Sequence, residues 1–237
     1  RDVDDAPLPS AYGFDESLVS FEGLGDRLCS NPKSLEKAKA LGHGNVILCK
    51  QWERMQIQTD RTIDFIHRHR HEPFFVRLFP NDVHDAHVPL PGTADEFQQL
   101  SDDPFVRNFL AVLKEMDRQI GRVMKTLDEL NLDKKTLVIF TSDNGGLEGF
   151  TDNGPLRGGK GMLYEGGIRV PMIAWGERIP GGRVNTQDPV QLTDLAPTLL
   201  EWSRTRTPES LPLAGTSLVS LLEEGTPLPE RDLYWHF

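Results

Sequence analysis

The sequence lacks several features that would place it in a specialised class of protein. It has no uninterrupted run of about 18 apolar residues, so it predicts no membrane span. Its first residues, Arg-Asp-Val-Asp-Asp, do not resemble a signal peptide. Basic residues number 26 against 36 acidic ones, and the formal charge of −10 argues against a nucleic-acid-binding surface, which needs a basic face.

Cysteine is also scarce. Cys29 and Cys49 are too few for a disulfide framework, and the sequence does not show whether they pair. We expect two free thiols without chemistry. The remaining composition, 38% hydrophobic and 26% charged over 237 residues, suits a globular protein of one large or two small domains.

The chain divides into three predicted segments. Residues 1–58 are rich in proline and glycine and lack periodicity, so they predict an irregular lead-in with one short strand at Asn45–Cys49. Residues 59–202 predict an α/β core. Residues 203–237 predict a tail that wraps the surface and ends in a short strand at Leu233–Trp235.

Helical and apolar extended patterns alternate in the predicted core. In chain order they are a helix, a strand, a helix and a strand, at Thr59–His71, Phe74–Phe79, Pro104–Leu130 and Thr136–Phe140. Thr59 and Asp103 are the predicted N-caps of the two helices. A further strand is predicted at Ile168–Trp175, with Pro171 favouring an edge position or a bulge. This alternation predicts a sheet with parallel strands.

Polar residues capable of chemistry lie in the loops around these strands. The loop after Phe79 carries His84 and His87, and Asp143 and Asn144 follow Phe140. A glycine-rich loop then carries Lys160, with Arg157 and Arg169 nearby in the chain. If the strands are parallel neighbours, these loops open on one edge of the sheet.

The residue types in these loops point to one class of reaction. Carboxylate and amide oxygens suit Ca²⁺ or Mg²⁺. A lysine suits a tetrahedral oxyanion, and a histidine can move a proton near neutral pH. Together they indicate metal-assisted hydrolysis of sulfate or phosphate esters. Taken alone, Asp143-Asn144-Gly145 is equally compatible with a simple turn.

The chain also resembles a known family. The segment Thr-Ser-Asp-Asn-Gly-Gly at 141–146, followed by Gly-Gly-Lys-Gly-Met-Leu-Tyr-Glu-Gly-Gly-Ile-Arg-Val-Pro at 158–171, resembles the C-terminal half of a type I sulfatase catalytic domain. Residues 82–89 resemble the upstream histidine segment of that family, and 194–200 its downstream helix. The resemblance covers most of the chain.

This resemblance implies an alkaline-phosphatase-like α/β/α sandwich with a mixed, mostly parallel sheet, a divalent cation that is usually Ca²⁺, and a formylglycine nucleophile. By position, Asp143 and Asn144 match metal ligands, and Lys160 matches the lysine that binds the sulfate. His84 matches the histidine that contacts the sulfate and acts as general acid, with His87 as the alternative. A sulfated small molecule or sulfated carbohydrate is the implied substrate, and the family favours a periplasmic or extracellular location.

The departures from the family pattern are equally informative. The formylglycine motif Cys/Ser-x-Pro-x-Arg is absent. Cys29-Ser30-Asn31-Pro32-Lys33 misplaces the proline and has lysine where arginine belongs, so we interpret it as unrelated. Asp4-Asp5 follows no apolar strand and predicts a solvated charge run rather than a metal-binding pair. We therefore expect a fragment whose N-terminal elements are missing, with an incomplete sheet and negligible activity alone.

Two alternatives remain at this stage. A phosphomonoester or phosphonate hydrolase of the same superfamily would present the same residues, because phosphate and sulfate are both tetrahedral oxyanions. A non-catalytic anion- or glycan-binding relative would lack the nucleophile. The sequence identifies neither the alcohol that carries the sulfate nor the oligomeric state.

Overall fold

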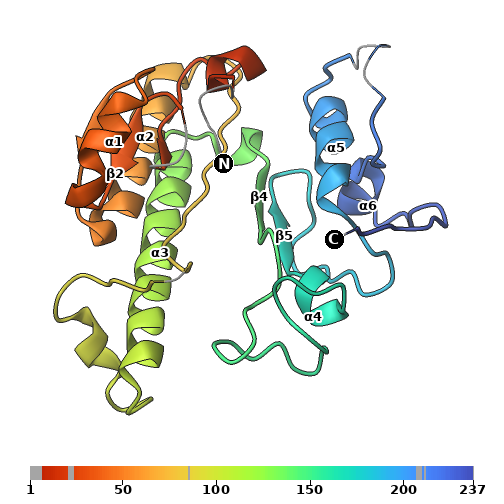
Figure 1. The fold of residues 1–237 in the computed structure, drawn as a ribbon. Coiled ribbons are helices and arrows are strands. Elements are labelled where there is room, and N and C mark those ends of the chain that lie inside the picture. Colours follow the sequence, from red (N-terminus) through yellow and green to blue (C-terminus); the bar gives the residue numbers. More distant parts are fainter. Residues whose placement is uncertain (1–6, 21–23, 85, 207–209, 211, 237) are drawn as a thin grey trace. The chain divides into compact units, whose positions relative to one another are not determined.

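The computed structural model describes residues 7–20, 24–84, 86–206, 210 and 212–236, so Asp4 and Asp5 lie outside the described residues. The chain forms two compact units, Arg1–Leu132 (unit 1) and Asp133–Phe237 (unit 2). Both units contain helices and strands (Figure 1), which confirms the α/β class.

A small parallel sheet lies near the start of unit 1. Its strands, in spatial order, are β1 (Val19–Ser20), β2 (Arg27–Cys29) and β3 (Val46–Leu48). Helix α1 (Leu35–Ala40) lies in the crossover that joins the parallel strands β2 and β3. The predicted strand at Asn45–Cys49 is confirmed as β3. Strands β1 and β2 lie where the sequence predicts loops, because runs of two or three residues carry no periodic signal.

Helix α2 (Arg54–His69) follows a 3₁₀ turn at Gln51–Glu53. It begins before Thr59, whose side chain is buried inside the helix, so the prediction of Thr59 as N-cap is wrong. The physical reason is that Arg54 to Gln58 favour helix as well as the residues after them do, and burial of Met55 extends the packed face.

Helix α3 (Pro104–Glu129) agrees closely with its prediction. The Asp103 side chain accepts a hydrogen bond from the Phe105 backbone N–H at 2.8 Å, which confirms Asp103 as N-cap. Asn131 lies just beyond the helix with a φ of 55°, a conformation that asparagine tolerates. Helices α2 and α3 pack together, and Arg122 of α3 pairs with Asp60 of α2 at 2.6 Å.

The predicted strand at Phe74–Phe79 is wrong as a paired strand. The segment is extended, but it pairs with no strand in the part of the chain that the structure describes. Its side chains alternate: Phe75 and Phe79 are exposed at 56% and 61%, as is Arg77, whereas Phe74, Val76 and Leu78 are half-buried. The apolar pattern of this segment predicts an extended backbone with two faces. A hydrogen-bonded β-ladder also needs a partner strand, which the pattern does not specify.

Unit 2 is built on a two-stranded antiparallel sheet. Strand β4 (Val138–Thr141) confirms the strand predicted at Thr136–Phe140, and β5 (Met172–Trp175) confirms the one predicted at Ile168–Trp175. The register pairs Thr141 with Met172 and Val138 with Trp175. These two strands run antiparallel, as a mixed sheet allows. A short helix, α4 (Glu165–Ile168), ends at the first residue of the stretch that the sequence assigns to the strand, and residues 169–171 belong to neither element.

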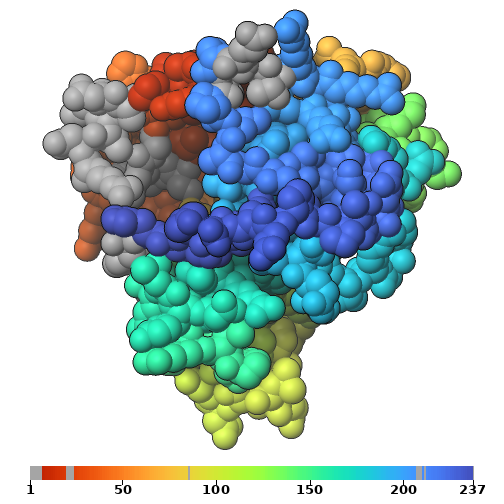
Figure 2. All heavy atoms as spheres, turned by 90° about the vertical axis from the view of Figure 1, so that its right-hand side faces the viewer, coloured from red at the N-terminus to blue at the C-terminus, as the bar shows by residue number. Residues whose placement is uncertain are grey.

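The rest of unit 2 contains helices α5 (Leu195–Trp202) and α6 (Val219–Glu223). The tail after α6 runs across the surface of unit 2, where Figure 2 shows it in dark blue. The predicted strand at Leu233–Trp235 is absent from the described tail, whose backbone is irregular there. Among the described helices of the chain, none combines the length and the apolar character that crossing a membrane demands.

Candidate active site

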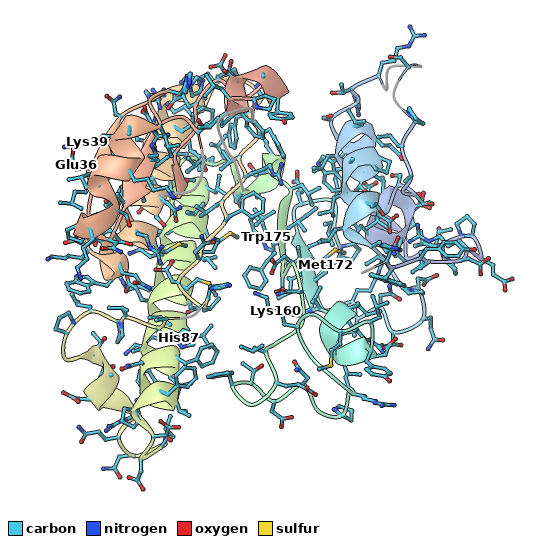
Figure 3. All side chains as sticks on the ribbon, viewed as in Figure 1. Glu36, Lys39, His87, Lys160, Met172 and Trp175 are labelled. Atoms are coloured by element: carbon cyan, nitrogen blue, oxygen red, sulfur yellow. The ribbon has the colours of Figure 1, made fainter. Side chains whose placement is uncertain are left out.

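The candidate site of unit 2 is carried by the connection between β4 and β5, residues 142–171. Because Thr141 and Met172 are register partners, the connection leaves and re-enters the sheet at the same end. Asp143 and Asn144 follow β4 directly, and Lys160 lies in the middle of the connection (Figure 3). The antiparallel pairing thus places these three predicted residues at one end of the sheet, whereas the sequence predicted that placement only on the condition that the strands are parallel neighbours.

Glycine makes the connection compact. The Gly145 N–H donates to the Gly167 carbonyl at 2.9 Å, and a Cβ at Gly145 would lie 1.8 Å from the Gly166 carbonyl oxygen. A Cβ at Gly167 would lie 2.1 Å from the Met162 carbonyl oxygen. Since no side chain fits at either position, the glycines allow backbone segments to pack directly on one another. This packing fixes the start of the connection against its end.

Asp143 and Asn144 lie close together. The Asn144 Nδ2 group donates to Asp143 Oδ1 at 3.0 Å, the Asp143 side chain is exposed and Asn144 is half-buried. The Ser142 hydroxyl donates to the Asn144 backbone carbonyl at 2.9 Å and holds the turn. Two side chains with oxygen donors therefore converge at the tip of β4.

Lys160 is anchored through its backbone and has an exposed side chain. Its N–H donates to the Gly146 carbonyl at 3.0 Å, two residues after Asn144. The connection also carries two arginines: the Arg157 guanidinium lies 3.9 Å from the Tyr164 ring centroid, and Arg169 pairs with Glu165 at 3.0 Å. Of the cations singled out in this connection, Lys160 is the one whose backbone is tied to the Asp143–Gly146 turn.

The two candidate histidines belong to unit 1 and have different environments. His84 is exposed at the end of the Phe74–Phe79 segment, where its backbone N–H donates to the Asn81 carbonyl at 3.1 Å. The His87 ring packs edge-on against Phe105 and Phe109 of α3, with centroid distances of 5.0 and 5.2 Å. His87 Nε2 lies 3.1 Å from the Val83 carbonyl, so that atom carries the proton. This packing gives His87 a structural role in unit 1.

No cluster of three or more histidine, cysteine, aspartate or glutamate residues suited to a metal ion occurs within the described residues. Asp143 and Asn144 accordingly form a pair of candidate ligands rather than a complete set. The candidate residues of unit 2, namely Asp143, Asn144 and Lys160, lie in one connection, whereas His84 belongs to the other compact unit.

Sequence reasoning missed Asn153. Its Nδ2 group donates to the carbonyls of Gly146 and Gly158 at 2.9 and 3.2 Å, and its Oδ1 accepts from the Gly146 N–H at 3.1 Å. Asn153 therefore ties the residues that follow Asp143 to those that precede Lys160. Asp152-Asn153-Gly154-Pro155 gives only a turn signal in the sequence, so nothing there could have revealed this role.

Cys29 lies in the central strand β2 and is fully buried. Its Sγ donates to the Asn31 carbonyl at 3.2 Å. Cys49 is also buried, and burial together with the nearby Glu53 carboxylate raises the pKa of its thiol. Both cysteines are free thiols, and neither presents a nucleophile to solvent, in agreement with the interpretation of 29–33 as unrelated to the missing motif.

Comparisons with known proteins agree on one family. The family model described as Sulfatase matches residues 6–205. Steryl-sulfatase of Mus musculus is 34% identical over 188 residues, which cover 75% of this chain and 29% of that protein. N-acetylgalactosamine-6-O-sulfatase of Bacteroides thetaiotaomicron is 33% identical over 172 residues, which cover 60% of this chain and 32% of that protein. The chain thus spans about 30% of the length of these curated relatives.

Solved structures extend the likeness to three dimensions. The crystal structure of Ps i-CgsB in complex with k-i-k-neocarrahexaose has a TM-score of 0.74 and 25% identity, covering 87% of this chain and 49% of that chain. The PsFucS1 sulfatase from Pseudoalteromonas sp. has a TM-score of 0.64 and 26% identity, covering 81% of this chain and 42% of that chain.

Proposed function

Because the chain belongs to the sulfatase family, we propose that it carries part of the site at which a sulfate monoester is hydrolysed. Its fold is the alkaline-phosphatase-like α/β fold of the solved sulfatases that it resembles. The observation that supports the proposal best is local. The β4–β5 connection brings Asp143, Asn144 and Lys160 to one end of a sheet and fixes them by glycine packing.

Asp143 and Asn144 fit a divalent cation as two of its ligands. Oxygen donors suit Ca²⁺, and Mg²⁺ is the alternative. A 180° rotation of the Asn144 amide places its oxygen 3.0 Å from Asp143 Oδ1, a separation compatible with two ligands of one ion. When bound, such an ion would polarise a sulfate oxygen. Ca²⁺ takes roughly six to eight oxygen ligands, so other groups must complete the site.

Lys160 supplies the positive charge for the substrate. Its ammonium group is a compact charge with three donors, suited to the sulfate and to the oxygen that bridges sulfur and the alcohol. Its fixed backbone restricts where that charge can reach. We assign it the stabilisation of negative charge on the departing oxygen.

His84 is the proposed general acid. An exposed imidazole can protonate the departing alkoxide near neutral pH, whereas the His87 ring is packed between aromatic rings and bonded to a backbone carbonyl. We therefore favour His84 over His87 for proton transfer. The hydrogen bond from His87 Nε2 to the Val83 carbonyl leaves the His87 ring little freedom to turn toward a substrate.

The 237 residues contain no Cys/Ser-x-Pro-x-Arg segment that could form the formylglycine expected in the family. Without that group no covalent sulfate intermediate forms on this chain. We infer that the chain alone hydrolyses sulfate esters negligibly. Rapid turnover of 4-nitrophenyl sulfate by the purified 237-residue chain would contradict this inference.

A sulfated carbohydrate or a sulfated small molecule is the proposed substrate. Among the relatives, the names include a steryl-sulfatase and an N-acetylgalactosamine-6-O-sulfatase, and one solved relative holds a neocarrahexaose. These names favour sulfate esters over phosphate esters. The rates at which the full-length native protein hydrolyses 4-nitrophenyl sulfate and 4-nitrophenyl phosphate distinguish a sulfate-ester hydrolase from a phosphate-ester hydrolase.

The decisive variant is Lys160→Ala in the full-length native protein. Loss of its charge is expected to lower kcat for 4-nitrophenyl sulfate by about 10²–10³-fold, the effect of removing one oxyanion-stabilising donor. Lys134→Ala is the matched control, because Lys134 is also an exposed lysine of unit 2 but precedes β4. Equal rates for the two variants would refute the role of Lys160.

A further inference from the structure

A pocket of about 350 Å³ lies within the β4–β5 connection, formed entirely by residues 148–158. It is a shallow hollow open to solvent, and its volume lies near the lower end of the range of small-ligand sites. None of the residues assigned to the proposed chemistry lines it. Its wall is mainly polar, with Glu148, Thr151, Asp152 and Asn153 contributing side chains and Leu156 an apolar surface.

The pocket is joined rigidly to the segment that carries Lys160. Asn153, in the pocket wall, donates to the Gly146 carbonyl, and the same carbonyl accepts the Lys160 backbone N–H. Gly158 also lines the pocket and accepts from Asn153. The backbone of Lys160 and the pocket wall are therefore held together through the Gly146 carbonyl, which limits how far the Lys160 side chain lies from the pocket.

The charge of the wall limits what the pocket can accept. Glu148 and Asp152 bring two carboxylates, and no lysine, arginine or histidine is among the lining residues. Carboxylates accept hydrogen bonds from hydroxyl groups but repel a second sulfate or a carboxylate. Asp152 Oδ1 already accepts from the Gly154 N–H at 2.8 Å, which holds its carboxylate in place.

We propose that this pocket binds an uncharged sugar ring of the substrate, next to the group that bears the scissile sulfate, and excludes rings with an anionic substituent. The proposal rests on the proposed function, because it makes the pocket a subsite of a sulfated carbohydrate. The sugar hydroxyls bond to Glu148, Thr151 and Asp152, and its C–H face contacts Leu156.

The test compares two probes of equal length, neutral β-galactotetraose and tetragalacturonate, by calorimetry on the full-length native protein. The wild type is expected to bind β-galactotetraose at least about tenfold more tightly, because charge repulsion acts on the tetragalacturonate alone. Glu148→Gln keeps the hydrogen-bonding capacity but removes one charge, and it should bring the two affinities closer together. Glu148→Trp, at the exposed rim, should block both probes.

Glu177→Gln and Glu177→Trp are the matched controls, since Glu177 is an exposed glutamate of unit 2 outside the pocket. Neither control should alter binding. Equal affinity of the wild type for both probes, or unchanged β-galactotetraose binding by Glu148→Trp, would overturn the subsite.

Neither probe is sulfated, so the outcome is separate from catalysis. If Lys160→Ala did not affect 4-nitrophenyl sulfate hydrolysis, the proposed function would be refuted. Binding of β-galactotetraose would still be observed in that case. Loss of the subsite alone would leave 4-nitrophenyl sulfate hydrolysis unaffected, because that substrate carries no sugar.

Discussion

At the scale of single residues, Asp82 is a buried carboxyl two positions before His84. Its side chain is 8% exposed, and Oδ2 has no hydrogen-bond partner among the described residues. Burial raises the pKa of this carboxyl, although the Arg54 charge acts in the opposite direction. A raised pKa in the folded state means that stability is fully present below the unfolded value and is lost as the pH rises through the folded value.

Asp82→Asn is therefore expected to raise the free energy of unfolding at pH 7 by about 1 kcal/mol, since it removes an unfavourable buried charge. The gain should vanish below about pH 4, where the unfolded carboxyl is also protonated. Urea unfolding at pH 4 and pH 7 measures the difference. Asp128→Asn, on the exposed side of α3, should have no comparable pH-dependent effect. A stability gain for Asp82→Asn that is equal at both pH values would contradict the assignment.

At the scale of elements, the N-terminus of α3 depends on one side chain. Asp103 accepts the Phe105 N–H at 2.8 Å, and its negative charge lies at the positive end of the helix dipole. Asp103→Ala is expected to destabilise unit 1 by about 1 kcal/mol in chemical unfolding. Asp102→Ala is the matched control, because Asp102 is the neighbouring exposed aspartate, and Asp103→Ser should restore most of the loss. Equal losses from both alanine variants would show that Asp103 does not act as a cap.

The same scale shows which elements can be predicted. Helix α3 can be read from the sequence because apolar residues recur along many turns and a cap and a proline mark its start. The Phe74–Phe79 segment has an equally clear apolar pattern, yet it forms no ladder within the described residues. Strand pairing depends on a second segment, which a local pattern does not specify.

At the scale of the whole molecule, one buried ion pair joins the C-terminal tail to the body of unit 2. The Arg231 guanidinium donates two hydrogen bonds to the fully buried Asp194 carboxylate, at 2.7 and 2.6 Å. The Gln191 and Thr216 N–H groups donate to the same carboxylate. Burial alone would raise the pKa of Asp194, but these donors outweigh it and lower the pKa below its ordinary value.

A lowered pKa has the opposite consequence from that of Asp82. The stability that Asp194 contributes is present above the unfolded value of about 3.9 and is lost as the pH falls through the folded value. Asp194→Asn is expected to destabilise unit 2 at pH 7 by about 3 kcal/mol, because it leaves the half-buried Arg231 guanidinium without its counter-charge. Tryptophan fluorescence during urea unfolding, with Glu201→Gln as an exposed control, measures this loss. A loss that stayed constant down to pH 2 would contradict the ion-pair explanation.

The sequence by itself determined the α/β class, the family and the position-by-position candidates Asp143, Asn144, Lys160 and His84. It could do so because the Asp143–Pro171 block resembles the sulfatase family over a specific run of residues, and because long helices repeat their pattern over many turns. The roles assigned to these four residues remain predictions, and measurements of the chemistry of Lys160 and His84 must test them.

Only the tertiary structure decided how these residues are held. The Asn153 side chain bridges Gly146 and Gly158 in a way that no turn signal specifies, and the antiparallel pairing of β4 with β5 depends on residues far apart in the chain. So does the packing of His87 between Phe105 and Phe109, which separates the two histidines. The physical reason is that each of these contacts is specified by shape and hydrogen bonding across space, whereas a sequence pattern reports only its own neighbours.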